Sequence, residues 1–180
     1  MSASPSPLSI GHVGLFVRDF DGMIAFYRDV LGFVQTDRGE RICFMSRDPA
    51  QHHQVVLCPG RPEGQAETVQ QLSFRVDTLE EVKAIHDRLV VAGVTKIDPC
   101  THGNAWSVYF RDPENNRLEF YADTPWHIPQ PFRRPMDYSQ PLDRVYAETK
   151  AICEAVPGFK PMQQYKTELA QRITAAQAAR

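Results

Sequence analysis

Residues 102–119, HGNAWSVYFRDPENNRLE, decide how the rest of the chain is interpreted. Two runs rich in aromatic and branched residues, 106–110 and 117–121, flank the turn-forming segment 111–116, a pattern typical of a β-hairpin. Alternate side chains of a strand share a face, so Glu119 points away from Leu118 and Phe120. A carboxylate in an apolar strand either faces solvent or, when buried, needs a positive charge such as a metal ion. The strand pattern alone favours solvent.

The hairpin belongs to the second copy of an internal repeat. The motif SRDP, which begins at Ser46, resembles FRDP, which begins at Phe110, and each lies between two short hydrophobic runs. Upstream, HVGLFVRD from His12 resembles QLSFRVDT from Gln71, and each leads into a helical pattern that ends near a glycine. We therefore expect an α+β fold of two strand–helix–strand–strand–strand (βαβββ) units, 8–60 and 68–123.

Local signals predict the elements of each unit. The first unit should contain a helix capped by Asp19 and ended by Gly32. In the second unit, Thr78 and Glu81 form a capping box for a helix that ends at Gly93. The expected strands are 10–17, 33–36, 42–45, 53–58, 69–76, 94–97, 106–110 and 117–121, with a hairpin turn at 37–39 and a linker at 59–66.

The C-terminal part of the chain differs in character from the repeat. We expect one domain at 1–123, followed by an extension at 124–180. Residues 124–141 are dense in proline and aromatic residues, which predicts an irregular segment packed across the domain. Residues 142–155 and 162–179 predict two helices, of which the last either protrudes or contacts another subunit.

Composition excludes several functional classes. The 180 residues carry a net charge of −2 without a basic stripe, which argues against nucleic acid as a partner. The N-terminus lacks a signal-peptide pattern, and no apolar run is long enough to span a membrane. The four scattered cysteines fit free thiols, so we expect a cytoplasmic protein.

The repeat, with His12, Glu119 and the turn after Asp112, resembles the vicinal oxygen chelate superfamily. That superfamily includes glyoxalases, extradiol ring-cleaving dioxygenases and bleomycin-resistance binding proteins. The order His102, Val108–Tyr109, Asp112–Pro113, Glu119 is similar to the pattern of type I extradiol dioxygenases. Asn115 stands where that family usually has glycine, and asparagine also tolerates the left-handed backbone conformation.

The resemblance implies a metal site formed by His12, Gln71 and Glu119. Ferrous oxygenases commonly present two histidines and one carboxylate, whereas Gln71 stands where the family normally has histidine. An amide oxygen can bind a divalent metal, but it should hold Fe(II) less firmly than imidazole does. Three alternatives stay open: an Fe(II) site with Gln71 as ligand, a site for another divalent metal or one completed by substrate, and a metal-poor cleft.

The resemblance also implies three catalytic residues. His53 corresponds to the acid–base histidine, a role that suits imidazole because its pKa lies near neutrality; His52 is its competitor. Tyr109 would hydrogen-bond a diol oxygen, and His102 would close over the same oxygen. Several aromatic residues either line the pocket or belong to the core: Trp106, Trp126, His127 and Phe132.

The predicted function is an extradiol dioxygenase that acts on a catechol-like diol with O2 and Fe(II), with a homodimer possible through the C-terminal helices. A glyoxalase-like lyase or isomerase is the first alternative, but such enzymes generally use a carboxylate where this chain has Val56. A binding protein without metal is the second, which Gln71 favours and the retained His12 and Glu119 oppose. A third is a structural role of the C-terminal helices, for which substitution of His12 would change nothing.

Overall fold

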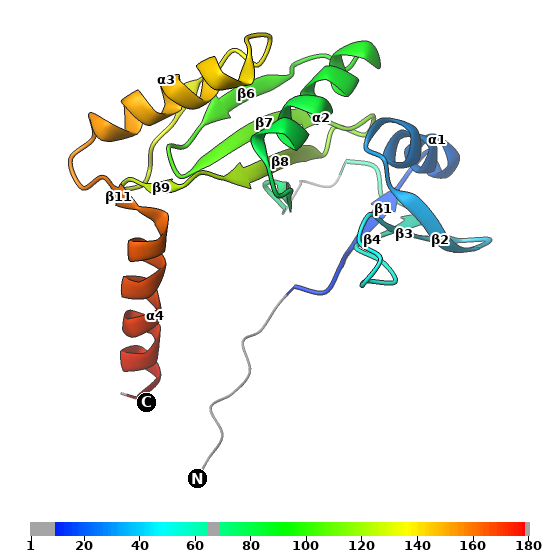
Figure 1. The fold of residues 1–180 in the computed structure, drawn as a ribbon. Coiled ribbons are helices and arrows are strands. Elements are labelled where there is room, and N and C mark those ends of the chain that lie inside the picture. The colour runs from blue at the N-terminus through cyan, green and yellow to red at the C-terminus, as the bar shows by residue number, and fades with distance from the viewer. Residues whose placement is uncertain (1–9, 65–68, 179–180) are drawn as a thin grey trace. The chain divides into compact units, whose positions relative to one another are not determined.

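The structure, a computed structural model, describes residues 10–64 and 69–178 (Figure 1). The chain forms two compact units, which we describe one at a time. The first consists of residues 1–68 together with the turn Asp112–Asn115, and the second of residues 69–111 and 116–180. The domain boundary after residue 123 stays a prediction.

The first unit contains a four-stranded sheet in the order β1-β4-β3-β2. Strand β1 is parallel to β4, and the other neighbours are antiparallel. The Asp19 side chain accepts a hydrogen bond from the Gly22 N–H and so caps α1, as predicted; Gly32, at φ 76°, follows the helical segment. The bounds are β1 Val13–Val17, α1 Phe20–Ala25, the π-helical segment η1 Phe26–Val30, β2 Val34–Gly39, β3 Ile42–Ser46 and β4 Val55–Pro59.

Three expectations for the first unit are wrong in detail. The strand expected at 10–17 begins at Val13, so His12 precedes β1. The hairpin turn is not at 37–39, because β2 continues to Gly39, which pairs with Ile42. A register shift between Gln35 and Asp37 and the exposure of all of β2 explain why this polar edge strand resembles a turn in sequence. Strand β4 begins at Val55, so His53 precedes the strand instead of opening it.

The second unit contains a five-stranded sheet in the order β10-β6-β7-β8-β5. Strand β5 is parallel to β8, and α2 packs against β7 and β8 through its buried residues Leu79, Val82, Ile85 and Leu89. The Thr78 hydroxyl accepts from the Glu81 N–H and caps α2, as predicted. The bounds are β5 Leu72–Arg75, α2 Leu79–Val91, β6 Asp98–Thr101, β7 Ala105–Arg111, β8 Arg117–Asp123 and β10 Arg134–Pro135.

The hairpin of β7 and β8 is confirmed, and Asn115 has the left-handed conformation that the sequence allowed, with φ 69°. The expected strand at 94–97 is wrong, because β6 lies at Asp98–Thr101. Lys96 has φ 60°, which interrupts an extended backbone. Within β6, Pro99 lies opposite Val108 of β7, and the pairing of β10 with β6 involves the next two residues, Cys100 and Thr101.

The C-terminal extension forms the two predicted helices, α3 (Leu142–Glu154) and α4 (Met162–Ala178). The expectation that 124–141 lacks regular structure is wrong in part, because β9 (Trp126–His127) pairs with β11 (Lys160–Pro161) and β10 joins the sheet edge. Helix α4 extends away from the second unit's sheet, and the side chains of residues 170–176 are exposed (Figure 1). No helix in the described parts of the chain is both long and apolar enough to cross a membrane.

The parallel strand pairs show that the two units are true counterparts. In the first unit Gly14 lies opposite Val56, and in the second Ser73 lies opposite Glu119. His12 precedes Gly14 by two residues, as Gln71 precedes Ser73. The predicted α+β fold of two βαβββ units is confirmed, and Val56 is the counterpart of Glu119.

Candidate functional site

Glu119 is buried at the centre of the second unit's sheet, with 6% of its surface exposed. Its Oε2 accepts hydrogen bonds from Ser73 Oγ at 2.5 Å and from Gln71 Nε2 at 3.0 Å. No lysine or arginine among the described residues forms an ion pair with it. The preference of the strand pattern for an exposed glutamate is therefore wrong. A buried carboxylate without a cationic partner is the kind of group that a bound cation stabilises.

Gln71 lies directly before β5, half-buried, and its orientation is set by Glu119 and Ser73. Its Nε2 donates to Glu119 and, at 2.9 Å, to Ser73 Oγ. Both amide hydrogens are then used, and the amide oxygen accepts no hydrogen bond from the described residues. The carboxylate and this amide oxygen are oxygen donors of the type that divalent cations accept.

Tyr109 on β7 lies opposite Glu119 in the antiparallel register. Burial, together with a hydrogen bond to Glu119 and the charge of that carboxylate, raises the pKa of Tyr109 well above its ordinary value. The Arg117 guanidinium lies over the Tyr109 ring, 4.5 Å from its centre. The phenol therefore keeps its proton at neutral pH and can act as a hydrogen-bond donor or acceptor.

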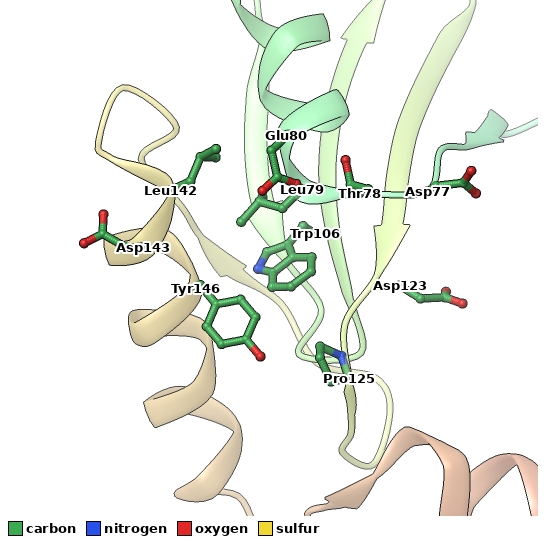
Figure 2. Close-up of a pocket in the computed structure, with 10 residues that line it drawn as sticks. All are labelled: Asp77, Thr78, Leu79, Glu80, Trp106, Asp123, Pro125, Leu142, Asp143 and Tyr146. Carbon is green, nitrogen blue, oxygen red and sulfur yellow. The ribbon is translucent and has the colours of Figure 1, made fainter.

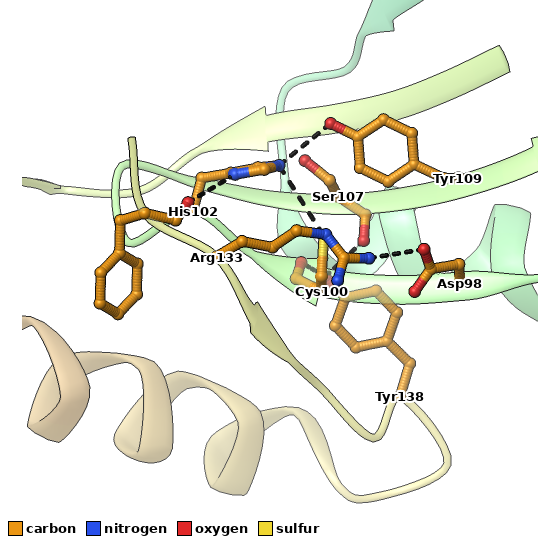
Figure 3. Close-up of polar contacts among 8 residues, drawn as sticks. Asp98, Cys100, His102, Ser107, Tyr109, Arg133 and Tyr138 are labelled. Atoms are coloured by element: carbon orange, nitrogen blue, oxygen red, sulfur yellow. Dashed lines mark hydrogen bonds and ion pairs between the residues drawn. The ribbon is translucent and has the colours of Figure 1, made fainter. Parts of the chain in front are cut away.

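His102 lies in the loop between β6 and β7, and its Nε2 is 3.0 Å from the Tyr109 hydroxyl (Figure 3). Its Nδ1 is 2.8 Å from the carbonyl oxygen of Phe132, in the C-terminal extension. The structure thus brings together four of the six predicted site residues in the second unit: Gln71, His102, Tyr109 and Glu119. Their roles stay predictions.

The other two predicted residues, His12 and His53, lie together in the first unit. Their ring centres are 4.4 Å apart, and His53 Nδ1 is 2.9 Å from His52 Nδ1. Desolvation, followed by the charges of His12 and His52, lowers the pKa of His53. His52 is exposed and its Nε2 lies 3.0 Å from Asp37 Oδ2. His53 is therefore the one of the pair that contacts the proposed ligand His12.

The proposed ligand set spans both units, with His12 in the first and Gln71 and Glu119 in the second. Within residues 10–64 and 69–178, no three His, Cys, Asp or Glu side chains are grouped so as to hold a metal ion. That finding does not cover a set that includes a glutamine. The donor types of His12, Gln71 and Glu119 fit a divalent cation, and their joint ligation stays a prediction.

Two groups that contact the predicted site residues were missed from the sequence. Ser73 hydrogen-bonds Glu119, and the repeat register could have identified it, because it lies two residues after Gln71. The Phe132 carbonyl, which contacts His102, could not have been found, because no sequence pattern reports a main-chain contact across 30 residues.

A separate pocket of about 380 Å³ lies in the second unit, beside the first turns of α2 and α3 (Figure 2). None of the six predicted site residues lines it. Trp106 does, and its Nε1 donates to Thr149 Oγ1 of α3 at 2.9 Å. Trp126 packs against Tyr146, and His127 stacks on Tyr165 of α4, so these aromatic residues fasten the C-terminal extension. The pocket is lined by Asp77, Thr78, Leu79, Glu80, Trp106, Asp123, Pro125, Leu142, Asp143 and Tyr146.

The fold thus consists of two βαβββ units, the second of which carries a buried acidic residue, Glu119, on its last strand. A model of the Glyoxalase/Bleomycin resistance protein/Dioxygenase superfamily matches residues 9–120. The chain therefore belongs to this superfamily, as the resemblance implied.

Similar curated proteins are dioxygenases of aromatic diols. The chain is 26% identical over 158 residues to biphenyl-2,3-diol 1,2-dioxygenase 3 of Rhodococcus globerulus, covering 85% of this chain and 78% of that protein. It is 29% identical to biphenyl-2,3-diol 1,2-dioxygenase 2 of the same organism, covering 68% and 65%. A manganese-dependent 2,3-dihydroxybiphenyl 1,2-dioxygenase of Geobacillus genomosp. 3 is 27% identical, over 63% of this chain and 36% of that protein.

Solved structures share the fold but carry varied names. A glyoxylase/bleomycin resistance protein/dioxygenase domain from Frankia sp. EAN1pec superposes with a TM-score of 0.54 and 28% identity, over 66% of this chain and 100% of that one. A lactoylglutathione lyase from Agrobacterium tumefaciens gives 0.53 and 21%, over 66% and 96%. At that identity, the lyase supports the fold alone.

Proposed function

We propose that this protein is a metal-dependent extradiol dioxygenase, which cleaves the ring of a catechol-like diol and places both atoms of O2 in the product. The observation that carries the proposal is the buried Glu119 carboxylate, held by Ser73 and Gln71 opposite the Tyr109–His102 pair. The names of the similar curated proteins support the same reaction and an aromatic diol as substrate.

In this proposal His12, Gln71 and Glu119 hold a divalent metal, with Fe(II) as the first candidate. The name of the Geobacillus relative makes Mn(II) the second. When bound, such a metal would supply a Lewis acid for the diol oxygens and a path for electrons between the diol and O2. The bond that breaks joins one diol carbon to the neighbouring ring carbon outside the diol, and the two oxygen atoms of O2 end on those two carbons.

The chain's own residues bind the diol and move its protons. A tyrosine is protonated at neutral pH, and the raised pKa of Tyr109 disfavours its ionisation further. Its neutral hydroxyl would hydrogen-bond a diol oxygen. His102 orients that hydroxyl through Nε2. His53, with its lowered pKa, is neutral at pH 7 and can accept a diol proton and later return it.

Two alternatives make different predictions. A glyoxalase-like lyase would bind a metal without consuming O2, and the apolar Val56 at the position equivalent to Glu119 argues against it. A metal-free binding protein would take up a ligand without turnover. Gln71 favours that alternative, because it replaces the imidazole ligand that the family resemblance implies.

To test the proposal, protein purified without air is titrated with Fe(II) or Mn(II) and then mixed with catechol, 2,3-dihydroxybiphenyl or 1,2-dihydroxynaphthalene. An oxygen electrode measures the oxygen uptake. Metal-dependent oxygen uptake that is lost in Glu119→Ala supports the proposal. The matched control is Glu40→Gln, which removes one negative charge at an exposed residue of the first unit. Metal binding without oxygen uptake would favour the lyase, and the absence of metal binding would favour the binding protein.

A further inference from the structure

The loop that carries His102 is enclosed by the C-terminal extension. The Gly103 carbonyl accepts hydrogen bonds from Thr124 Oγ1 at 2.6 Å and from Cys153 Sγ at 3.3 Å. A Cβ atom on Gly103 would lie 2.3 Å from Ile128 Cδ1, and Gly103 has φ 75°. The position of His102 therefore depends on residues beyond 120, where the superfamily match ends.

One side chain of the extension binds the main chain at both His102 and Phe132. Gln130 Nε2 donates to the His102 carbonyl at 2.8 Å, and Gln130 Oε1 accepts from the Phe132 N–H at 3.0 Å. Two residues further on, Arg134 pairs with Thr101 where β10 joins β6. Gln130 and this strand pair hold Phe132 beside the imidazole from both directions.

The Phe132 carbonyl decides which imidazole nitrogen carries the proton. A carbonyl oxygen can only accept, so Nδ1, 2.8 Å away, must be the protonated nitrogen. In the neutral ring Nε2 is then an acceptor, and it lies 3.0 Å from the Tyr109 hydroxyl (Figure 3). The other tautomer would place two lone pairs against each other at Nδ1 and the carbonyl oxygen.

We propose that the Phe132 carbonyl, held in place by Gln130, is a positioning group that fixes His102 as the Nδ1–H tautomer and thereby makes His102 Nε2 an acceptor for the Tyr109 proton. The Tyr109 hydroxyl has one proton and two acceptors within reach, His102 Nε2 and the Glu119 carboxylate. With Nε2 as acceptor, His102 competes with the Glu119 carboxylate for the Tyr109 proton, and when the proton points to His102 the phenol oxygen can accept from a diol hydroxyl. A ring protonated at Nε2 would reverse this arrangement.

The effect on catalysis rests on the proposed function, whereas the tautomer itself does not. The direct test is therefore nitrogen NMR of protein with ¹⁵N-labelled histidine, in the absence of substrate, with the His102 signals assigned from their loss in His102→Asn. We expect a single His102 tautomer with the proton on Nδ1 in the wild type, and a mixture of tautomers in Gln130→Ala. The matched control is Gln140→Ala, in the same segment, where the side chain contacts Asp137 and not His102.

A His102 proton on Nε2 in the wild type would overturn the role of the Phe132 carbonyl. An unchanged Nδ1–H tautomer in Gln130→Ala would overturn the role of Gln130. If the enzyme cleaves diols, Gln130→Ala should lower kcat about tenfold, as outer-shell partners typically do, with KM changed less than about twofold. A fixed Nδ1–H tautomer in a protein that does not turn over any diol would refute the proposed function and leave the inference standing.

Discussion

Glu119 on β8 lies directly opposite Ser73 on β5, and the Ser73 hydroxyl donates to its carboxylate at 2.5 Å. At the equivalent positions of the first unit, Val56 lies opposite Gly14. The two units therefore share a backbone register but differ in chemistry, because only the second places a buried carboxylate at this point of its sheet.

The Glu119 carboxylate should dominate metal binding. Glu119→Gln keeps the shape of the side chain but removes its charge, so affinity for Fe(II) or Mn(II) should fall by more than about 100-fold, because loss of an outer-shell partner alone costs about 10–100-fold. Ser73→Ala, which removes such a partner, should lower affinity about tenfold. Anaerobic calorimetric titration measures both; equal affinity in Glu119→Gln and Glu40→Gln would exclude Glu119 as a ligand.

Gln71 should respond to replacement by the residue that the family resemblance implies. Imidazole is a softer donor than an amide oxygen, so Gln71→His should tighten Fe(II) binding more than it tightens Mn(II) binding. Gln71→Ala should weaken both. Competition titrations of the two metals on the three proteins report this selectivity, and an affinity for both metals that is unaffected by either substitution would remove Gln71 from the site.

Substitution of Gly103 by alanine should lower the free energy of unfolding far more than the same substitution of Gly93. Both have positive φ, but a Cβ on Gly93 meets nothing within 4 Å, whereas one on Gly103 overlaps Ile128. Gly93→Ala should lower the free energy of unfolding by about 1 kcal/mol from backbone strain. Gly103→Ala adds overpacking of about 1–3 kcal/mol. Urea denaturation measures the free energy of unfolding of both variants. Equal losses would contradict the conclusion that the C-terminal extension encloses the loop at Gly103.

Stability should decline at alkaline pH partly through Cys100. Burial raises the pKa of this thiol to about 11, whereas an unfolded thiol ionises near pH 8.5. Between about pH 9 and pH 11 the folded state therefore holds a proton that the unfolded state has lost, so the free energy of unfolding falls as pH rises.

Cys100→Ala should remove up to about 2 kcal/mol of that decline, since one pKa unit is worth about 1.4 kcal/mol. Urea denaturation at several pH values measures the slope, with Cys58→Ala, at a half-buried position, as the control. The same alkaline slope in Cys100→Ala and the wild type would contradict this origin.

The sequence predicted where the helices of the repeat begin and end because the signals for helix ends are local. The glycines that follow the helices and the capping residues Asp19 and Thr78 act within a few residues, and the structure confirms them. Strand β6 was misplaced because Asp98 and Pro99 are weak strand formers that pair only because β7 supplies a template.

Burial of Glu119 and the contact between Phe132 and His102 were beyond the sequence for a different reason. The first depends on the covering of both faces of β8, where Leu118, Glu119 and Phe120 are all buried, and a period of two residues reports that faces alternate but not that both are covered. The second depends on β10 joining β6 across more than 30 residues, through a segment whose prolines argued against a strand.

The most direct test of the account is the stoichiometry of oxygen consumed and diol lost by the metal-loaded protein in a closed cell, with the product identified by NMR. We predict one O2 consumed for each diol, a ring-opened product cleaved beside the diol, and no reaction in Glu119→Ala. Oxygen uptake that yields a quinone or hydrogen peroxide with the ring intact, or the same turnover in Glu119→Ala, would contradict it.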